Sequence, residues 1–233
     1  MKEANWKDIA LLIEDLEVLA NAKNNLVSIG PIPSQLTCIG KGTDAAVLIH
    51  NDFPQYAFKI YAYGKEEKRR NEVKAYEKLN NHFYFPTFYG SGKRFIAISY
   101  EQGINLHDCL IKGIEIPPSV IEQVDEAIAY ARQAGLNPRD IHLKNIIMQE
   151  HTIKLIDVSE YVLPGNDERW EHLKEGYRMY YPLIRHRKIP AELIEFMKAY
   201  YQKYQTAGFS KQMINQLLFL FFKKSDQHKE DAQ

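Results

Sequence analysis

Cysteine is scarce in this chain. Its 233 residues contain only Cys38 and Cys109, with no Cys-x-x-Cys pair and no paired Cys/His spacing. Such spacings are the usual signature of a structural zinc site or a disulfide framework. We therefore expect two reduced thiols, no zinc and a cytoplasmic location.

An excess of charge of one sign is also missing, as is a long apolar run. Lys plus Arg total 30 and Asp plus Glu total 30, so the formal net charge is zero. The longest apolar run, Met213 to Phe222, is roughly half the length that a membrane-spanning helix needs. Met1 to Trp6 lacks the basic-then-apolar order of a signal peptide. We expect no nucleic-acid partner and no membrane partner.

The first half of the chain has the patterning of a helix followed by a small sheet. Hydrophobic residues make up 45% of the chain, which favours a globular core over disorder. Helical spacing from Asn5 to Ala20 predicts a helical extension over residues 1–30. A small lobe over residues 31–100 should then hold a helix at Lys65 to Asn80 and five antiparallel strands. The expected strands are Thr37–Ile39, Ala46–Ile49, Tyr56–Tyr61, Thr87–Gly90 and Arg94–Tyr100.

The second half, residues 101–225, is expected to be a mostly helical lobe, with a frayed tail at 226–233. One hairpin interrupts the helices, with Asn145–Met148 and Ile153–Ile156 as its strands. The predicted fold class is therefore α+β, with two lobes. The expected helices are Val120–Ala134, Asp167–Tyr180, Ala191–Tyr204 and Lys211–Phe222.

A glycine-containing turn lies between the first two predicted strands. It reads Gly40-Lys41-Gly42-Thr43-Asp44. Two glycines at this spacing let the backbone approach a ligand and direct N–H groups at phosphate oxygens. The same spacing is also common in a plain hairpin turn, so the motif alone leaves both interpretations open.

A lysine inside an apolar strand is the next unusual feature. Lys59 follows Tyr56-Ala57-Phe58, and a buried ammonium needs a partner. Glu72 lies thirteen residues later on the helix that must cross this sheet. We predict a Lys59–Glu72 ion pair; the alternative is an edge lysine and a solvated glutamate.

Three polar residues in the second half have the spacing of a phosphoryl-transfer site. Asp140 and Asn145 lie five apart in one loop, and Asp157 ends a strongly apolar strand. One carboxylate can orient an attacking hydroxyl, while a carboxylate and an amide oxygen suit Mg²⁺. Each residue alone could be a turn former or a cap, but their order and spacing together favour function.

Taken in order, these segments resemble the protein-kinase-like superfamily, which includes RIO-type kinases and the aminoglycoside and choline phosphotransferases. The glycine-rich motif falls on Gly40, Gly42, Ala45 and Val47, with Ala45 in place of the third glycine. The resemblance, strongest to small bacterial serine/threonine-protein-kinase-like proteins, implies a bilobal fold that binds ATP and Mg²⁺. It implies catalytic roles for Asp140, Lys59 and Glu72, and metal binding by Asn145 and Asp157. It implies ATP contacts at Ile39, Gly40, Lys41, Gly42, Thr43, Val47, Ala57, Lys59, Ile98, Ser99, Tyr100 and Glu101.

The chain departs from the pattern of the family in its acceptor half. Pro138 replaces the usual histidine, and His142 gives the Asp-x-His pattern typical of RIO-type and small-molecule kinases. Val158-Ser159 replaces Phe-Gly, and Asp167 is expected to cap the next helix soon afterwards. A long activation segment therefore has no room in the sequence.

Three functions fit these features. The first is an ATP- and Mg²⁺-dependent serine/threonine protein kinase that can act on itself. The second is a small-molecule kinase, whose acceptor pocket could be lined by Glu160, Tyr161, Trp170, His172 and Arg178; the alternative is that these five are packing and surface groups. The third is a nucleotide-binding scaffold with negligible turnover. The identity of the acceptor, protein or small molecule, is left open by the sequence.

Overall fold

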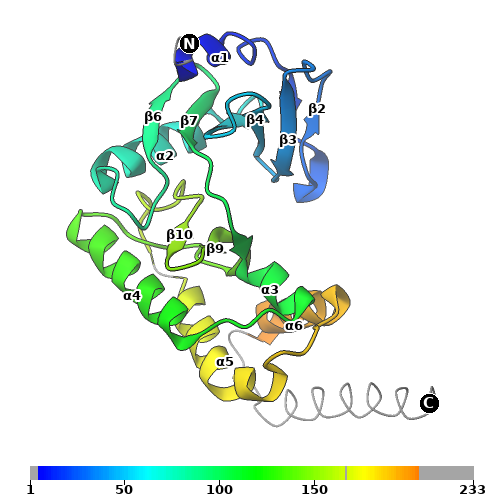
Figure 1. Ribbon diagram of the computed structural model, residues 1–233, viewed down its shortest axis with the longest axis vertical. Coiled ribbons are helices and arrows are strands. Elements are labelled where there is room, and N and C mark those ends of the chain that lie inside the picture. Colours follow the sequence, from blue (N-terminus) through cyan, green and yellow to red (C-terminus); the bar gives the residue numbers. More distant parts are fainter. Residues whose placement is uncertain (1–4, 166, 205–233) are drawn as a thin grey trace, which may run out of the picture. The chain divides into compact units, whose positions relative to one another are not determined.

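The computed structural model describes residues 5–165 and 167–204 (Figure 1). The chain up to Lys188 forms one compact unit, and from Ile189 onward it belongs to a second, which contains helix α6 (Ala191–Tyr204). The helix predicted at Lys211–Phe222 and the tail at 226–233 lie outside the described residues. Within the described part of the chain, no helix combines the length and apolarity that crossing a bilayer requires.

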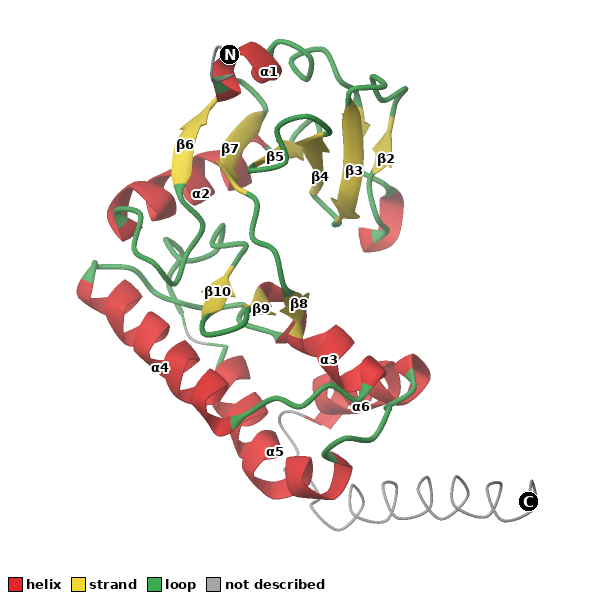
Figure 2. Ribbon diagram, viewed as in Figure 1, coloured by secondary structure: helices red, strands yellow, loops and turns green. Residues whose placement is uncertain are grey.

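The first unit contains a five-stranded antiparallel sheet and one crossing helix, α2 (Glu66–Leu79) (Figure 2). The strand order is β3-β4-β5-β7-β6, with every neighbouring pair antiparallel. The predicted sheet and its helix are therefore confirmed. The strands are β3 (Leu36–Lys41), β4 (Ala45–His50), β5 (Tyr56–Tyr61), β6 (Phe88–Ser91) and β7 (Phe95–Ser99).

Side-chain alternation along β5 gives this sheet two different faces. Ala57 and Tyr61 belong to the same buried cluster as α2, which we call the inner face. Phe58 and Ile60 pack in a separate cluster on the outer face. Because successive side chains of a strand point to opposite faces, Lys59 is directed to the inner face, toward α2.

The N-terminal segment covers the outer face, but not as the predicted helix over Asn5–Ala20. Helix α1 (Trp6–Ala10) is only five residues long, and the chain then forms a two-stranded ribbon of β1 (Val18–Leu19) and β2 (Ser28–Ile29). The helical interpretation failed because its apolar positions are not all on one buried side: Leu19 is 48% exposed. The buried residues that contact the outer face are Ile9, Ala10, Ile13, Leu16, Val18 and Val27.

Several contacts fix the N-terminal segment to the sheet, and two of them lie at the β3–β4 turn and at β6. The Val27 N–H donates to the Gly42 carbonyl at 2.9 Å, next to the β3–β4 turn. On β6, Gly90 has φ +156°, and a Cβ there would lie 2.5 Å from the Trp6 ring. The segment therefore braces the small sheet.

The rest of the first unit is mostly helical, as predicted. Helix α4 begins at Pro118 and ends before Gly135, whose φ is +71°. On α5, Trp170 is buried and its indole N–H donates to Asp125 of α4 at 2.6 Å. Strand β8 and helix α3 were not predicted, whereas the β9–β10 hairpin was. The elements are β8 (Ile104–Asn105), α3 (Leu106–Lys112), α4 (Pro118–Gln133), the 3₁₀ turn η2 (Leu143–Asn145), β9 (Ile146–Met148), β10 (Ile153–Leu155) and α5 (Arg169–Ile184).

Candidate active site

Lys59 lies at the centre of a buried charge cluster. Its Nζ is 2.7 Å from Glu72 Oε2 and 2.7 Å from Asp157 Oδ1. The Glu72 side chain is 0% exposed and that of Lys59 is 13% exposed, so little water screens this pair. The predicted Lys59–Glu72 contact is confirmed, and Asp157 joins it from the segment after β10. A cation has thus been fixed between the sheet, the crossing helix and the chain beyond the hairpin.

The charged groups of this cluster shift one another's pKa values. Burial by itself would lower the pKa of Lys59, but the Asp157 and Glu72 carboxylates outweigh it and raise the pKa above its usual value. Burial would likewise raise the pKa of Asp157, yet the Lys59 ammonium keeps that pKa below its usual range. Burial raises the pKa of Glu72, which also accepts a hydrogen bond from the Tyr61 hydroxyl. Lys59 and Asp157 therefore stay charged at neutral pH.

The backbone conformation at Gly40 and Gly42 would also allow a residue with a side chain. The Gly42 N–H donates to the Ala45 carbonyl at 2.8 Å, and the β3–β4 register shifts between Cys38 and Gly40. A Cβ would meet its nearest neighbour at 3.9 Å at Gly40 and at 3.5 Å at Gly42, which is ordinary contact, and neither residue has a positive φ. The space above these glycines is consistent with close approach by a ligand.

Three apolar residues predicted to contact ATP are brought to the inner face of the sheet. The strand register places Val47 opposite Lys59 and Ala57 opposite Ile98. Ala57 and Ile98 are buried, and Val47 packs against the same cluster. These side chains form an apolar surface beside the lysine.

The other predicted ATP contacts lie at the two ends of this surface. Tyr100 donates its N–H to the Gln55 carbonyl at 2.8 Å, which fixes the connector after β7. Ser99 donates its hydroxyl to the Glu101 carboxylate, and Glu101 Oε2 lies 3.5 Å from Lys154 Nζ. At the turn, Ile39, Lys41 and Thr43 are exposed. Their roles toward ATP stay predictions.

The Asp140 loop is held by contacts from the start of α5. Asp140 has φ +56°, and its N–H donates to Asp167 Oδ2 at 2.7 Å. The Arg169 guanidinium contacts Asp140 Oδ1, and the Asn145 amide donates to the Asp140 carbonyl at 3.3 Å. Non-glycine residues in this backbone region are strained and cluster at functional sites. Asp157, with φ +59°, is another of the seven non-glycine residues with positive φ in the described part of the chain.

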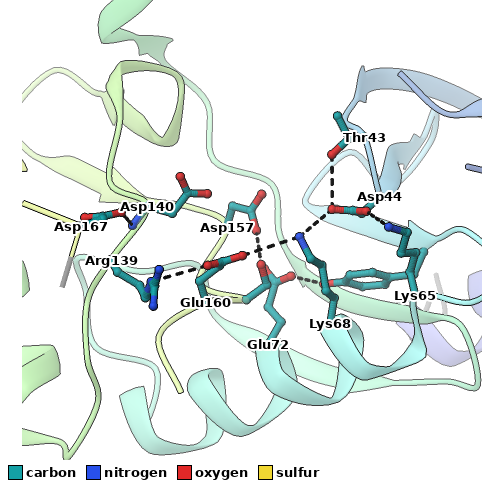
Figure 3. A network of polar contacts seen from close by, with 12 residues as sticks. Thr43, Asp44, Lys65, Lys68, Glu72, Arg139, Asp140, Asp157, Glu160 and Asp167 are labelled. Atoms are coloured by element: carbon teal, nitrogen blue, oxygen red, sulfur yellow. Dashed lines mark hydrogen bonds and ion pairs between the residues drawn. The ribbon is translucent and has the colours of Figure 1, made fainter. Parts of the chain in front are cut away.

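The Asp140 carboxylate is suited to accept a proton. Burial raises its pKa above the usual value, although the Arg169 guanidinium opposes the shift. Figure 3 shows Asp140 beside Asp157, whose charge also raises the pKa of Asp140. Asp157 Oδ1 also accepts a hydrogen bond from the Ser159 hydroxyl at 3.0 Å. The two aspartates predicted from the sequence thus lie in one site with different partners.

A second network, which we call the Lys68 network, was missed in the sequence (Figure 3). Lys68 Nζ lies 2.7 Å from Asp44 Oδ2 at the glycine turn and 3.7 Å from Glu160 Oε1. Glu160 Oε2 in turn lies 3.6 Å from Arg139 Nε, next to Asp140. One signal was available: Lys68 is four residues before Glu72, so both lie on one face of α2.

The residues considered for a small-molecule pocket have packing and surface positions instead. Tyr161 and Trp170 are buried in the hydrophobic core, whereas Arg178 is exposed on α5. The five residues proposed as a small-molecule pocket therefore do not line one cavity. Asp167 does not cap α5 in the expected place, because Glu168 is the N-cap; Asp167 Oδ1 nevertheless accepts the Arg169 N–H at 3.2 Å.

The protein donors at the predicted metal site are few. Among the described residues, no group of three or more His, Cys, Asp or Glu side chains is arranged to hold a metal ion. Asn145 directs its amide nitrogen to the Asp140 carbonyl, which leaves the amide oxygen as its donor to a cation. An amide and a carboxylate oxygen fit Mg²⁺, which is usually bound through one or two carboxylates, water and substrate phosphates.

The comparisons with known proteins agree with this geometry. The chain matches no protein-family model. It is 36% identical over 172 residues to a Bacillus subtilis (strain 168) protein named "Putative serine/threonine-protein kinase YrzF", covering 72% of this chain and 80% of that protein. It is also 27% identical over 92 residues to testis-specific serine/threonine-protein kinase 3 of Mus musculus and of Homo sapiens, covering 38% of this chain and 31% of each relative. With its small sheet, crossing helix and lysine-centred ion pair, the chain belongs to the protein-kinase-like superfamily and is a kinase-type phosphotransferase.

Proposed function

We propose that this enzyme transfers the γ-phosphoryl group of Mg²⁺-bound ATP to a serine or threonine hydroxyl of a protein, its own chain included. The observation that carries the proposal is the position of Lys59, held at 2.7 Å from both Glu72 and Asp157. The acceptor class rests on the names of the relatives, which are serine/threonine-protein kinases.

The nucleotide would bind against the inner face of the sheet. Val47, Ala57 and Ile98 offer apolar contact to the base, and the backbone of Ser99 to Glu101 offers hydrogen bonds to its edge. Lys59 and N–H groups of the glycine turn other than that of Gly42, which donates to Ala45, would hold the phosphates, since fixed cations and N–H dipoles stabilise phosphoryl charge. Asn145 and Asp157 would hold Mg²⁺, which when bound neutralises charge on the phosphates.

Asp140 would act on the acceptor. Its carboxylate would orient the hydroxyl and take its proton while the hydroxyl oxygen bonds to the γ-phosphorus and the bond to ADP breaks. Such a task is realised in the transition state more than in the ground state. Removing the carboxylate should therefore lower turnover and leave nucleotide affinity nearly unchanged.

A second candidate is phosphoryl transfer to a small-molecule alcohol. It is favoured by the short chain between Asp157 and the start of α5 at Arg169, which leaves little room for a peptide-docking segment. For either acceptor we propose a cytoplasmic enzyme without a nucleic-acid or membrane partner, because the net charge is zero and both cysteines are free.

The test compares the wild type with Asp140→Asn at saturating labelled ATP, with and without Mg²⁺, offering the chain itself, cell-extract proteins and extract metabolites as acceptors. We expect Asp140→Asn to transfer phosphate about 10²–10⁴-fold more slowly, the range for a positioned acid/base group. Nucleotide titrations of both proteins should agree, and omission of Mg²⁺ should abolish transfer.

Asp52→Asn is the matched control, because Asp52 is exposed in the β4–β5 turn. Label on metabolites alone would favour the small-molecule enzyme. If the wild type binds nucleotide but transfers no faster than Asp140→Asn to any acceptor, the scaffold interpretation replaces the enzyme.

A further inference from the structure

Arg169 contacts the Asp140 carboxylate directly, and no motif pointed to it. It is the first residue of α5, and its guanidinium contacts Asp140 Oδ1 across 29 positions of sequence. The side chains of Arg169 and Asp140 are 43% and 33% exposed. The contact is therefore open to the solvent from which an acceptor would arrive.

Arg169 is itself held by Asp167. The Arg169 N–H donates to Asp167 Oδ1 at 3.2 Å, and its Nε lies 3.5 Å from Asp167 Oδ2. The same Asp167 accepts the Asp140 N–H at 2.7 Å. The main chain and the carboxylate of Asp140 are thus both fixed from one corner of α5. This arrangement limits rotation of the Asp140 side chain, since a guanidinium presents its donors in a rigid fork.

We propose that Arg169 is a positioning residue that acts through Asp140. The Arg169 guanidinium binds Oδ1 of Asp140 and thereby directs Oδ2 toward the incoming hydroxyl. The inference rests on the proposed role of Asp140 as the group that orients the acceptor. It adds a requirement: the loop by itself does not fix the carboxylate, and the start of α5 completes the site.

The same contact could have the opposite role, in which the Arg169 guanidinium blocks the site. If the guanidinium occupied the place of the acceptor hydroxyl, its removal would open the site and raise turnover. The two roles therefore predict changes of opposite sign in kcat. A purely structural contact would change the folding midpoint and leave the kcat of the folded protein unaltered.

The experiment measures kcat and KM for ATP in the wild type, Arg169→Gln, Arg169→Lys and Asp140→Asn. We expect Arg169→Gln to lower kcat about 10- to 100-fold, the cost of a loosely held catalytic group, with KM for ATP within about twofold. Arg169→Lys should recover part of the loss. In the Asp140→Asn background, Arg169→Gln should cause no further loss, because the residue acts through Asp140. Arg178→Gln, exposed on the same helix, is the matched control.

Several results would overturn the inference. They are a higher kcat in Arg169→Gln, an unchanged kcat, or a further loss of the same size when Asp140 is already replaced. An unchanged Arg169→Gln beside a slow Asp140→Asn would refute only this inference. If Asp140→Asn were as fast as the wild type, the proposed function would fall as well. Unfolding midpoints of the ligand-free proteins identify a variant that fails to fold, and Arg169→Lys then supplies the comparison.

Discussion

The Lys59 cluster and the surroundings of Asp140 hold their charges in different ways. Lys59 and Glu72 lie on regular elements, β5 and α2, and the Glu72 side chain is 0% exposed. Asp140, Arg139 and Glu160 lie on irregular segments, and the Glu160 side chain is 26% exposed. The Lys59–Glu72 pair is thus shielded from solvent and built on scaffold elements, although its partner Asp157 is 41% exposed; the residues around Asp140 are partly exposed and lie on loops.

The difference indicates which half of the site is preformed. A buried pair that loses one partner leaves an uncompensated charge, so it resists rearrangement. An exposed pair gains little energy and is screened by salt, so it can exchange partners when a substrate arrives. We therefore expect a rigid nucleotide side and an adjustable acceptor side, and the following variants test this contrast.

The largest effect on stability is expected at Lys59. Lys59→Met keeps the length of the side chain but leaves Glu72 buried without its cation, which should lower the free energy of unfolding by about 3–5 kcal/mol. Chemical denaturation of the ligand-free protein measures it. Adding Glu72→Gln should restore part of the loss, because the uncompensated charge is then gone.

Lys93→Met is the control, since Lys93 is exposed in the turn between β6 and β7. It should change the free energy of unfolding by less than about 0.5 kcal/mol. Equal effects at Lys59 and Lys93 would remove the basis for calling the nucleotide side rigid.

A smaller effect, on binding alone, is expected at the glycine turn. Gly42→Ala meets no close contact and no positive φ, so stability should stay the same or rise by up to about 1 kcal/mol. A Cβ would hinder a phosphate from reaching the turn, and the loss of one hydrogen bond should weaken ATP affinity about tenfold. Calorimetric titration measures the affinity.

Gly90→Ala is the control for Gly42→Ala, and its expected effects are the opposite. Its φ of +156° and the Trp6 ring at 2.5 Å should make alanine destabilising, while ATP affinity stays at the wild-type value. If Gly42→Ala were to bind ATP normally, the turn would have no role in phosphate binding.

The smallest effect is expected at the Lys68 network. Glu160→Gln removes the charge that Lys68 and Arg139 share, at 3.7 Å and 3.6 Å. Exposed pairs of this kind contribute about 0–1 kcal/mol, so the free energy of unfolding should change by no more than that. The change should disappear at about 1 M salt, where the screening length is about 3 Å. A loss as large as that of Lys59→Met would show that both halves of the site are equally rigid.

The same contrast explains what the sequence could predict. Lys59 stands out because an apolar strand with period-2 alternation makes a charge conspicuous, and Glu72 follows from the helix that must cross the sheet. Arg169 and Asp167 gave no such signal, because loop residues have no periodicity and their partners lie far away in sequence. The long-range contact between Arg169 and Asp140 is visible only after folding.

Hydrophobic periodicity also gave a wrong prediction for the N-terminal segment. Apolar residues from Asn5 to Ala20 fit a helix, yet the chain buries them through a short helix, turns and a ribbon. Helical spacing alone did not decide the element, since burial depends on the apolar area removed from water and not on the element that supplies it. Strand β8, two residues long, and helix α3, seven residues long, are too short for a periodic signal.

The two tryptophans of the chain give each half of the molecule its own optical reporter. Trp6 lies against Gly90 on the small sheet, and Trp170 is hydrogen-bonded to Asp125 behind the Asp140 loop. With either one changed to phenylalanine, the fluorescence of the other follows one half of the molecule alone. Movement of the sheet and of the α4–α5 region can thus be recorded separately during a single turnover, without an attached dye.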